Sequence, residues 1–281
     1  LSAVRFLYIP TLAREPQPAD GQATASVDVA LSWRAGREAV SHEVYMGTDP
    51  SALVLTATTQ ESLYQTADLD YASTYYWQIV EVNDAENPAS YAGDIWSFST
   101  PDYIVVDDFD QYDDKCQRIF FAWEDGLGHN GAEDVDDCDV PPSNGNGGGS
   151  IVGNAQAPFA EQSIVHAGSQ SMPLEYNNAF GPSEATLLLD SQDWTASNIQ
   201  TFAIAFYGSE GNTGQLYVKI NNAKIAYDHD PADIALAMWH IWNIDLSSVG
   251  GNLSNVTELT MGIEGATAAG MLYIDSIRLY P

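Results

Sequence analysis

The chain has 281 residues, and 45% of them are hydrophobic, which is enough apolar content for two ordinary domains. Nine Lys and Arg against 39 Asp and Glu give a formal net charge of −30, which disfavours nucleic acid and anionic membrane surfaces as partners. No apolar run approaches the ~20 residues that span a bilayer, so membrane insertion is not expected.

Residues 1–10 predict a strand that has no partner nearby in the sequence, and a Pro-containing linker follows it. This strand resembles the last strand of the chain, because SAVRFLYIP and DSIRLYP both run through a β-branched residue, Arg, Tyr and Pro. Two explanations stay open. The strand is a remnant of a preceding jelly roll, or it is donated to a sheet of another copy through Val4, Phe6 and Tyr8.

Residues 11–100 contain short strands at hairpin spacing. Apolar and polar residues alternate from Val27 to Trp33, and the segment 74–82, TYYWQIVEV, is the strongest β pattern of the chain. No helical periodicity is present. The pattern predicts a small antiparallel sandwich.

This segment resembles a fibronectin type III domain. The resemblance is carried by Trp33 and by the run Leu69-x-Tyr71-x-Ser73-x-Tyr75, in which Tyr71 replaces the Pro of the family. It implies that Tyr75 forms a tyrosine corner and that the core contains Trp33, Tyr75, Trp77 and Ile79.

Residues 101–281 predict a second and larger β domain. Nine or ten strand patterns between residues 103 and 280, one of them at residues 163–166, indicate a two-sheet jelly roll. A polar excursion at 126–154, which ends in a glycine run, is expected to be a mobile surface loop. Cys116 and Cys138 lie in one polar stretch and predict a disulfide in an oxidising compartment, the alternative being two free thiols. The predicted fold class is therefore all-β.

Three fragments of the second domain resemble the galactose-binding-like jelly rolls that include many carbohydrate-binding modules. They are the segments 108–110 (DFD), 166–172 (HAGSQSM) and 273–277 (YIDSI). Together with the fibronectin-like segment, they are similar to secreted multidomain proteins of bacteria. The resemblance implies an extracellular or cell-surface location.

The same resemblance implies a structural calcium ion (Ca2+) that links the first strand to the last. Carried over position by position, its ligands are Asp108, Asp110, the Ser169 carbonyl and Asp275. Calcium prefers six to eight hard oxygen ligands, which these residues supply in part. The alternative is that these acids are solvated ends of strands.

The sequence predicts a protein that is not an enzyme. The nucleophile pattern Gly-x-Ser-x-Gly is absent, and the five His have no zinc-ligand spacing. With 39 acidic residues, pairs of carboxylates are unavoidable and do not indicate a glycosidase.

The first functional prediction is a non-catalytic extracellular binding or adhesion protein that binds a polysaccharide or glycoconjugate. Sugars stack on aromatic faces, and the candidates are Trp123, Trp194, Tyr207 and Tyr227. Of Trp239 and Trp242, at least one is expected in the core. The alternative is a structural subunit of a filament or surface assembly, in which neighbouring copies of the chain exchange their N-terminal strands.

Overall fold

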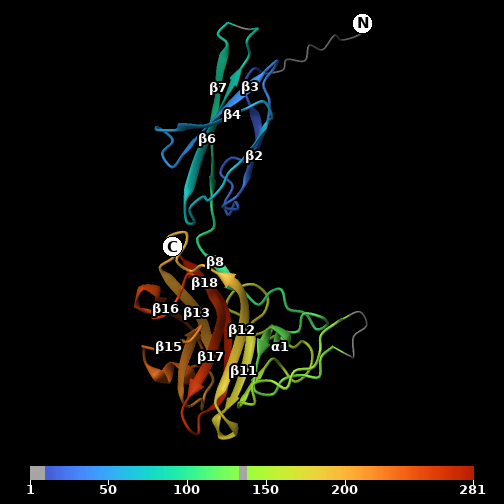
Figure 1. The fold of residues 1–281 in the computed structure, drawn as a ribbon, viewed down its shortest axis with the longest axis vertical. Coiled ribbons are helices and arrows are strands. Elements are labelled where there is room, and N and C mark those ends of the chain that lie inside the picture. The colour runs from blue at the N-terminus through green and yellow to red at the C-terminus, as the bar shows by residue number, and fades with distance from the viewer. Residues whose placement is uncertain (1–9, 86, 133–137) are drawn as a thin grey trace. The chain divides into compact units, whose positions relative to one another are not determined.

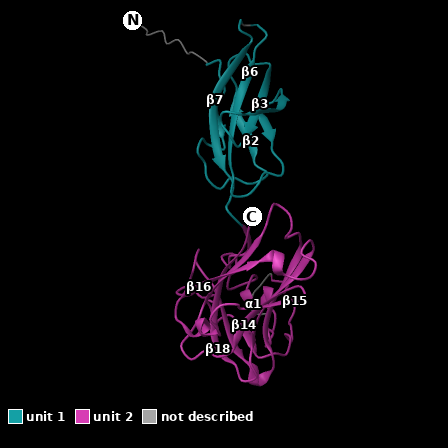
Figure 2. Cartoon of the chain, turned by 90° about the vertical axis from the view of Figure 1, so that its left-hand side faces the viewer, with its two compact units in different colours: residues 1–103, 281 teal, residues 104–280 magenta. Residues whose placement is uncertain are grey.

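The computed structural model describes residues 10–85, 87–132 and 138–281. Figure 2 shows its two compact units, which are residues 1–103 with residue 281 (unit 1) and residues 104–280 (unit 2). Both are built almost wholly from antiparallel strands, so the fold is all-β as predicted. No helix in the described part of the chain is long and apolar enough to cross a membrane. Val4, Phe6 and Tyr8 lie outside the described residues, so strand exchange stays a prediction.

Unit 1 consists of two antiparallel sheets that share one core. The smaller sheet has the order β1-β2-β5 and contains β1 (Arg14–Gln17), β2 (Ala30–Arg34) and β5 (Leu63–Gln65). The larger sheet has the order β4-β3-β6-β7 and contains β4 (Val54–Thr59), β3 (Ser41–Gly47), β6 (Thr74–Val82) and β7 (Ser90–Ser99).

The core of unit 1 is the one that strand periodicity predicts. Trp33, Tyr75, Trp77 and Ile79 are all buried, because they occupy the inward positions of β2 and β6. The Tyr75 hydroxyl accepts a hydrogen bond from the Asp70 N–H at 3.0 Å, the kind of contact expected of a tyrosine corner. Membership of the fibronectin type III family stays a prediction.

Unit 2 is a sandwich of a six-stranded and a five-stranded sheet (Figure 1). The six-stranded sheet has the order β10-β11-β18-β13-β16, with β8 also paired to β18. Its strands are β8 (Ile104–Asp107), β10 (Ser150–Val152), β11 (Met172–Asn177), β13 (Thr201–Tyr207), β16 (Trp239–Asp245) and β18 (Ala269–Tyr280).

The five-stranded sheet of unit 2 has the order β15-β14-β17-β12-β9. Its strands are β9 (Trp123–Glu124), β12 (Ser183–Gln192), β14 (Gln215–Ile220), β15 (Ala223–Ala226) and β17 (Val256–Glu264). Alternate residues of both sheets, such as Phe206, Ile274, Val218 and Met261, meet in one buried core between them.

Helices are few and short in unit 2. They are α1 (Ile119–Ala122) and three 3₁₀ turns, η1 (Asn178–Phe180), η2 (Pro231–Ala235) and η3 (Leu246–Ser248). The Asp230 side chain caps η2 by accepting the Ala232 N–H at 2.9 Å.

The strand expected at residues 163–166 does not form. The segment between Glu161 and Ser171, which form an isolated bridge, is an irregular loop. The reason is that the backbone N–H groups of His166 and Ala167 donate to the Asp275 side chain and not to a neighbouring strand.

Within the polar excursion, the glycine run at residues 145–150 is packed where the sequence predicts a mobile loop. The Gly149 N–H donates to the Pro182 carbonyl, and the Asn177 N–H donates to the Gly149 carbonyl. A Cβ atom added at Gly148 would lie 2.0 Å from the Pro182 oxygen. The glycines therefore permit close contact between backbones, which is a different use of glycine from a flexible linker.

The disulfide between Cys116 and Cys138 is confirmed, with a Cα–Cα distance of 5.3 Å. It links the segment before α1 to the middle of the polar excursion. The described residues contain no free cysteine.

Candidate functional site

Three of the four aromatic residues predicted to stack on sugar are in the core of unit 2. The exposed fraction is 0% for Trp123, 1% for Trp194 and 3% for Tyr227. Their polar atoms are bonded inside the protein: Trp123 Nε1 donates to Asp107, Trp194 Nε1 to Gln192 and the Tyr227 hydroxyl to Asp233. The prediction that Trp123, Trp194 and Tyr227 stack on sugar is therefore wrong, because a buried ring has no face that a ligand can reach.

The fourth residue, Tyr207, belongs to a row of aromatic side chains on the outer face of the six-stranded sheet. Strand register places Tyr207 of β13 opposite Trp239 of β16 on one side and opposite Tyr273 of β18 on the other. The ring centroids are 5.5 Å apart for Trp239 and Tyr207, and 6.1 Å apart for Tyr207 and Tyr273. All three side chains are half-buried. We call these three residues the aromatic row.

The polar atoms of the aromatic row are uncommitted. The Tyr207 and Tyr273 hydroxyls and Trp239 Nε1 make no hydrogen bond to the residues that the structure describes, yet none of them is a fully buried atom. Burial, then the charge of Glu161, raises the pKa of Tyr273, so its hydroxyl keeps its proton at neutral pH. The row therefore combines apolar rings with hydrogen-bonding groups that solvent reaches.

A buried aspartate positions the loop beside the row. Asp275 Oδ2 accepts the N–H groups of His166 at 2.7 Å and Ala167 at 3.1 Å. His166 Nδ1 lies 3.0 Å from Ser276 Oγ, and its ring centroid lies 5.4 Å from that of Trp239. A β-bulge at Ser276, whose φ is 51°, allows Asp275 and Ser276 to meet this loop while Ile274 and Ile277 both enter the core.

Two exposed apolar side chains extend the surface around Trp239. Met238 is 54% exposed and Ile241 is 55% exposed, and Ile241 shares the outer side of β16 with Trp239. Asn243, the next outward residue of this strand, is exposed. This face can stack on the C–H groups of a ring and donate to or accept from its hydroxyls.

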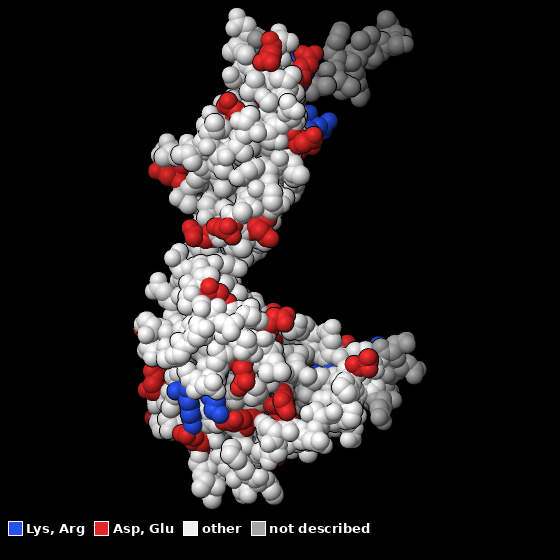
Figure 3. Space-filling view, viewed as in Figure 1, with Lys and Arg blue, Asp and Glu red and all other residues white. Residues whose placement is uncertain are grey.

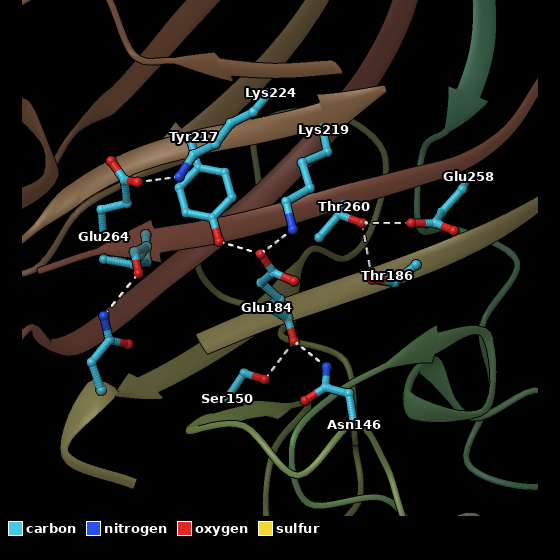
Figure 4. Close-up of polar contacts among 12 residues, drawn as sticks. Asn146, Ser150, Glu184, Thr186, Tyr217, Lys219, Lys224, Glu258, Thr260 and Glu264 are labelled. Atoms are coloured by element: carbon cyan, nitrogen blue, oxygen red, sulfur yellow. Dashed lines mark hydrogen bonds and ion pairs between the residues drawn. The ribbon is translucent and has the colours of Figure 1, made fainter. Parts of the chain in front are cut away.

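The outer face of the five-stranded sheet is different, because its polar groups bind one another (Figure 4). The Tyr217 hydroxyl and the Lys219 ammonium both meet the carboxylate of Glu184, and Lys224 pairs with Glu264. Burial alone would raise the pKa of Glu184, but its bonds to Lys219 and Tyr217 lower it below the usual value.

Tyr217 on this face has no free ring surface. It is 4% exposed, because one side faces Gly262, where an added Cβ would lie 2.3 Å from Cζ, and Lys224 Nζ lies 3.7 Å from the ring centroid. Two of the chain's three Lys are used in this network. Figure 3 shows how sparse basic side chains are among the acidic ones. We therefore place the candidate site on the aromatic row.

The three aspartates predicted to bind calcium accept hydrogen bonds in the structure, and Ser169 donates two of them. Asp110 Oδ1 accepts from Ser169 N at 2.7 Å and from Ser169 Oγ at 2.8 Å, and Asp275 accepts from the loop as described. Asp108 accepts the Asp110 N–H at 3.3 Å. Among the described residues, no group of three or more His, Cys, Asp or Glu is arranged to hold a metal. In this arrangement, the four predicted ligands do not form a calcium site. Binding of the ion stays a prediction, and thermal unfolding with calcium and with a chelator tests it. An unchanged unfolding midpoint would contradict the predicted site.

Sequence reasoning missed Trp239 and Tyr273 as surface residues. The alternation of β16 could have identified Trp239 as a surface residue, because Trp242 and Ile244 are the residues of this strand that enter the core. Trp239 is an odd number of residues from Trp242, so strand periodicity places it on the opposite face. The expectation that at least one of Trp239 and Trp242 is core is confirmed by Trp242, which is fully buried.

No protein-family model matches this sequence, and no curated protein matches it. Solved structures with some similarity include one of carbohydrate-binding modules from the β-sandwich superfamily, at 10% identity and a TM-score of 0.34. That match covers 98% of this chain and 99% of the other.

Two further structures show the same range of similarity. A family 11 carbohydrate-binding module from Clostridium thermocellum, in complex with a β-1,3-1,4-mixed-linked tetrasaccharide, is 16% identical with a TM-score of 0.34, over 47% of this chain and 87% of the other. An exo-β-agarase is 13% identical with a TM-score of 0.35, over 43% of this chain and 21% of the other. With identities and TM-scores this low, the likenesses carry no argument about the site or its ligand.

Proposed function

We propose that this chain is a non-catalytic protein that acts outside the cell and binds a neutral polysaccharide across the aromatic row. The observation that carries the proposal is the register of Trp239, Tyr207 and Tyr273 on three adjacent strands. Adjacent strands are about 4.8 Å apart, so the row spans on the order of 10 Å, which suits a short stretch of a sugar chain.

The charge of the chain supports a neutral ligand. A net charge of −30 repels polysaccharides that carry carboxylate or sulfate groups. The two lysines of the five-stranded sheet are held by Glu184 and Glu264, so they do not supply a counter-charge. The disulfide supports an oxidising, extracellular compartment.

The use of the buried carboxylates supports a non-catalytic role. Asp107, Asp125 and Asp275 are the buried aspartates among the described residues of unit 2, and burial raises the pKa of each. Asp107 accepts from Tyr112, Trp123 and the Phe109 N–H, and Asp125 accepts three backbone N–H groups. These carboxylates hold loops and rings in place, and their hydrogen bonds occupy most of their acceptor positions.

The proposal is tested by affinity electrophoresis of the full chain through gels that contain neutral polysaccharides (mixed-linkage β-glucan, xylan, agarose, galactomannan). At least one of them is expected to retard the protein. Trp239→Ala with Tyr207→Ala should weaken that retardation at least tenfold, because each aromatic contact contributes about 1 kcal/mol beyond its buried area. The matched control is Tyr217→Phe, which changes a tyrosine of the other outer face and should leave retardation unchanged. Equal retardation of the double variant would contradict the proposal.

A further inference from the structure

A cavity of unit 2 lies between α1, the polar excursion and the start of β10. Its volume is about 730 Å³, within the usual range of small-molecule sites. Phe120 and Phe159 supply aromatic walls, and Leu127, which is 65% exposed, lies at its edge. The two Phe rings meet edge to face, with centroids 5.1 Å apart. We call this cavity the loop pocket.

The disulfide joins the two walls of the loop pocket. Cys116 lies two residues before Arg118, which lines one wall, and Cys138 lies two residues before Val140. The Ala132 N–H donates to the Val140 carbonyl at 3.1 Å, and an added Cβ at Gly131 would lie 2.4 Å from the same carbonyl oxygen. The position of the wall that contains Gly131 therefore depends on the bond between Cys116 and Cys138.

The charges of the loop pocket select against ionic ligands. Glu175 and Asn130 have no side-chain hydrogen bond or ion pair to the described residues, so they are available to a ligand. The Glu175 carboxylate repels an anion and accepts only from donors. The Arg118 guanidinium, which lies 5.0 Å from the Phe159 ring centroid, opposes a cation in the same space.

His129 in this pocket is a neutral donor. Its Nδ1 accepts the Gly131 N–H at 3.1 Å, which leaves the ring proton on Nε2, and burial lowers its pKa. Its ring contacts Phe121, with centroids 4.7 Å apart, so it is held in the wall.

We infer that the loop pocket is a second binding site, which takes a single neutral sugar ring, and that it exists only while Cys116 and Cys138 are bonded. The ring would stack on Phe120 and Phe159 and donate hydroxyl hydrogen bonds to Glu175. Glu175 of β11 lies beside Met271 of β18, on the outer face that also holds Tyr273, but the two Phe rings of the pocket are not part of the aromatic row, so each site is tested by its own variants.

The test is an NMR titration of the uniformly ¹⁵N-labelled full chain with methyl glycosides of glucose, galactose, xylose and N-acetylglucosamine. At least one of them is expected to shift the amide signals of Gly131, Gly153 and Glu175. Glu175→Ala should weaken this binding about tenfold, since a hydrogen bond to a charged group is lost. Phe159→Leu should weaken it as well, whereas Phe180→Leu, at an exposed position elsewhere in unit 2, should leave it unchanged.

The same titration is repeated on the Cys116→Ser, Cys138→Ser variant. Unchanged amide signals of Tyr207 and Trp239 show that its sandwich is folded, and the pocket amides should then no longer respond to the sugar. If the sandwich of this variant is unfolded, the titration is repeated on the wild-type protein in mild reductant. The amide signals of Tyr207 and Trp239 again show whether the sandwich is folded. If no glycoside shifts the pocket amides of the wild type, the second site is refuted. If the disulfide-free protein responds equally, the dependence on the disulfide is refuted. Neither result bears on the aromatic row, which is tested by polysaccharide retardation.

Discussion

At the scale of single residues, Asp275 illustrates how a buried charge serves a surface site. Its carboxylate is fully buried, and it accepts two backbone N–H groups from the loop that brings His166 against Trp239. A buried polar group is tolerated only when it is hydrogen-bonded, so the loop and the bulge of β18 depend on each other.

Asp275→Ala is expected to destabilise unit 2 by about 2 kcal/mol, because two N–H groups lose their acceptor. Asp275→Asn should cost less, since the amide oxygen can accept both N–H groups and the amide nitrogen can donate to Ser276 Oγ. Urea unfolding of the two variants measures the difference. Equal losses for Ala and Asn would mean that the N–H contacts contribute nothing.

The stability difference between wild type and Asp275→Asn should depend on pH, because burial raises the pKa of Asp275. The folded state binds the proton more tightly than the unfolded state, whose pKa is about 3.9. The stability contributed by this group is therefore present at low pH and is lost as pH rises from about 4 through the folded pKa. Wild type should lose stability relative to Asp275→Asn across that window, and a constant difference would contradict the assignment.

Residue roles were predictable from the sequence where strand alternation is long, as in the core positions Trp33, Trp77 and Ile79. They were not predictable for Trp123, because its strand β9 has two residues and its burial depends on pairing with β12, far away in sequence. Trp194 lies outside any strand and packs on Phe202, a contact that no local pattern encodes.

At the scale of elements, the polar excursion shows that glycine content alone does not decide between a linker and a packed segment. The sequence places no partner beside residues 145–150, whereas the folded chain brings Asn177 and Pro182 against them. The strands were predictable because β11, β13, β16, β17 and β18 carry their own periodicity. The loop at 163–166 was not, because its partner is the side chain of Asp275.

Gly148→Ala is expected to destabilise unit 2 by about 3 kcal/mol, because the new Cβ would overlap the Pro182 oxygen. Gly147→Ala is the matched control: it meets nothing within 4 Å, and only its φ of 74° opposes it, at about 1 kcal/mol. Thermal unfolding of both variants measures this. Equal small effects would mean that the glycine run is a free linker.

Loss of the Cys116–Cys138 disulfide is expected to lower the free energy of unfolding of unit 2 by about 3 kcal/mol. The bond closes a loop between residues 22 apart in sequence, which restricts the unfolded chain. Guanidinium unfolding of a Cys116→Ser, Cys138→Ser variant measures this loss. An unchanged midpoint would show that the excursion is held by its backbone hydrogen bonds alone.

At the scale of the whole molecule, each unit has a separate hydrophobic core, and all three residues of the aromatic row lie in unit 2. The sequence predicted two β units, residues 11–100 and 101–281, from their strand patterns and the apolar content. It did not predict which outer face leaves its polar groups without partners in the described chain, because that depends on which polar groups meet across strands.

A chain of residues 104–281 is therefore expected to fold alone and to bind the same polysaccharide as the full chain, with equal affinity. Circular dichroism and affinity electrophoresis check both points. A tenfold loss of affinity in a folded unit 2 would mean that unit 1 contributes to binding.

The most direct test of the aromatic row uses the fluorescence of its tryptophan. Trp239 is half-buried, whereas the other six of the seven tryptophans are buried, so acrylamide should quench Trp239 selectively. Addition of a polysaccharide that retards the protein should protect this accessible fraction from quenching, and Trp239→Phe should remove the effect. Quenching that stays the same when the polysaccharide is bound would contradict the proposal that the ligand lies across Trp239, Tyr207 and Tyr273.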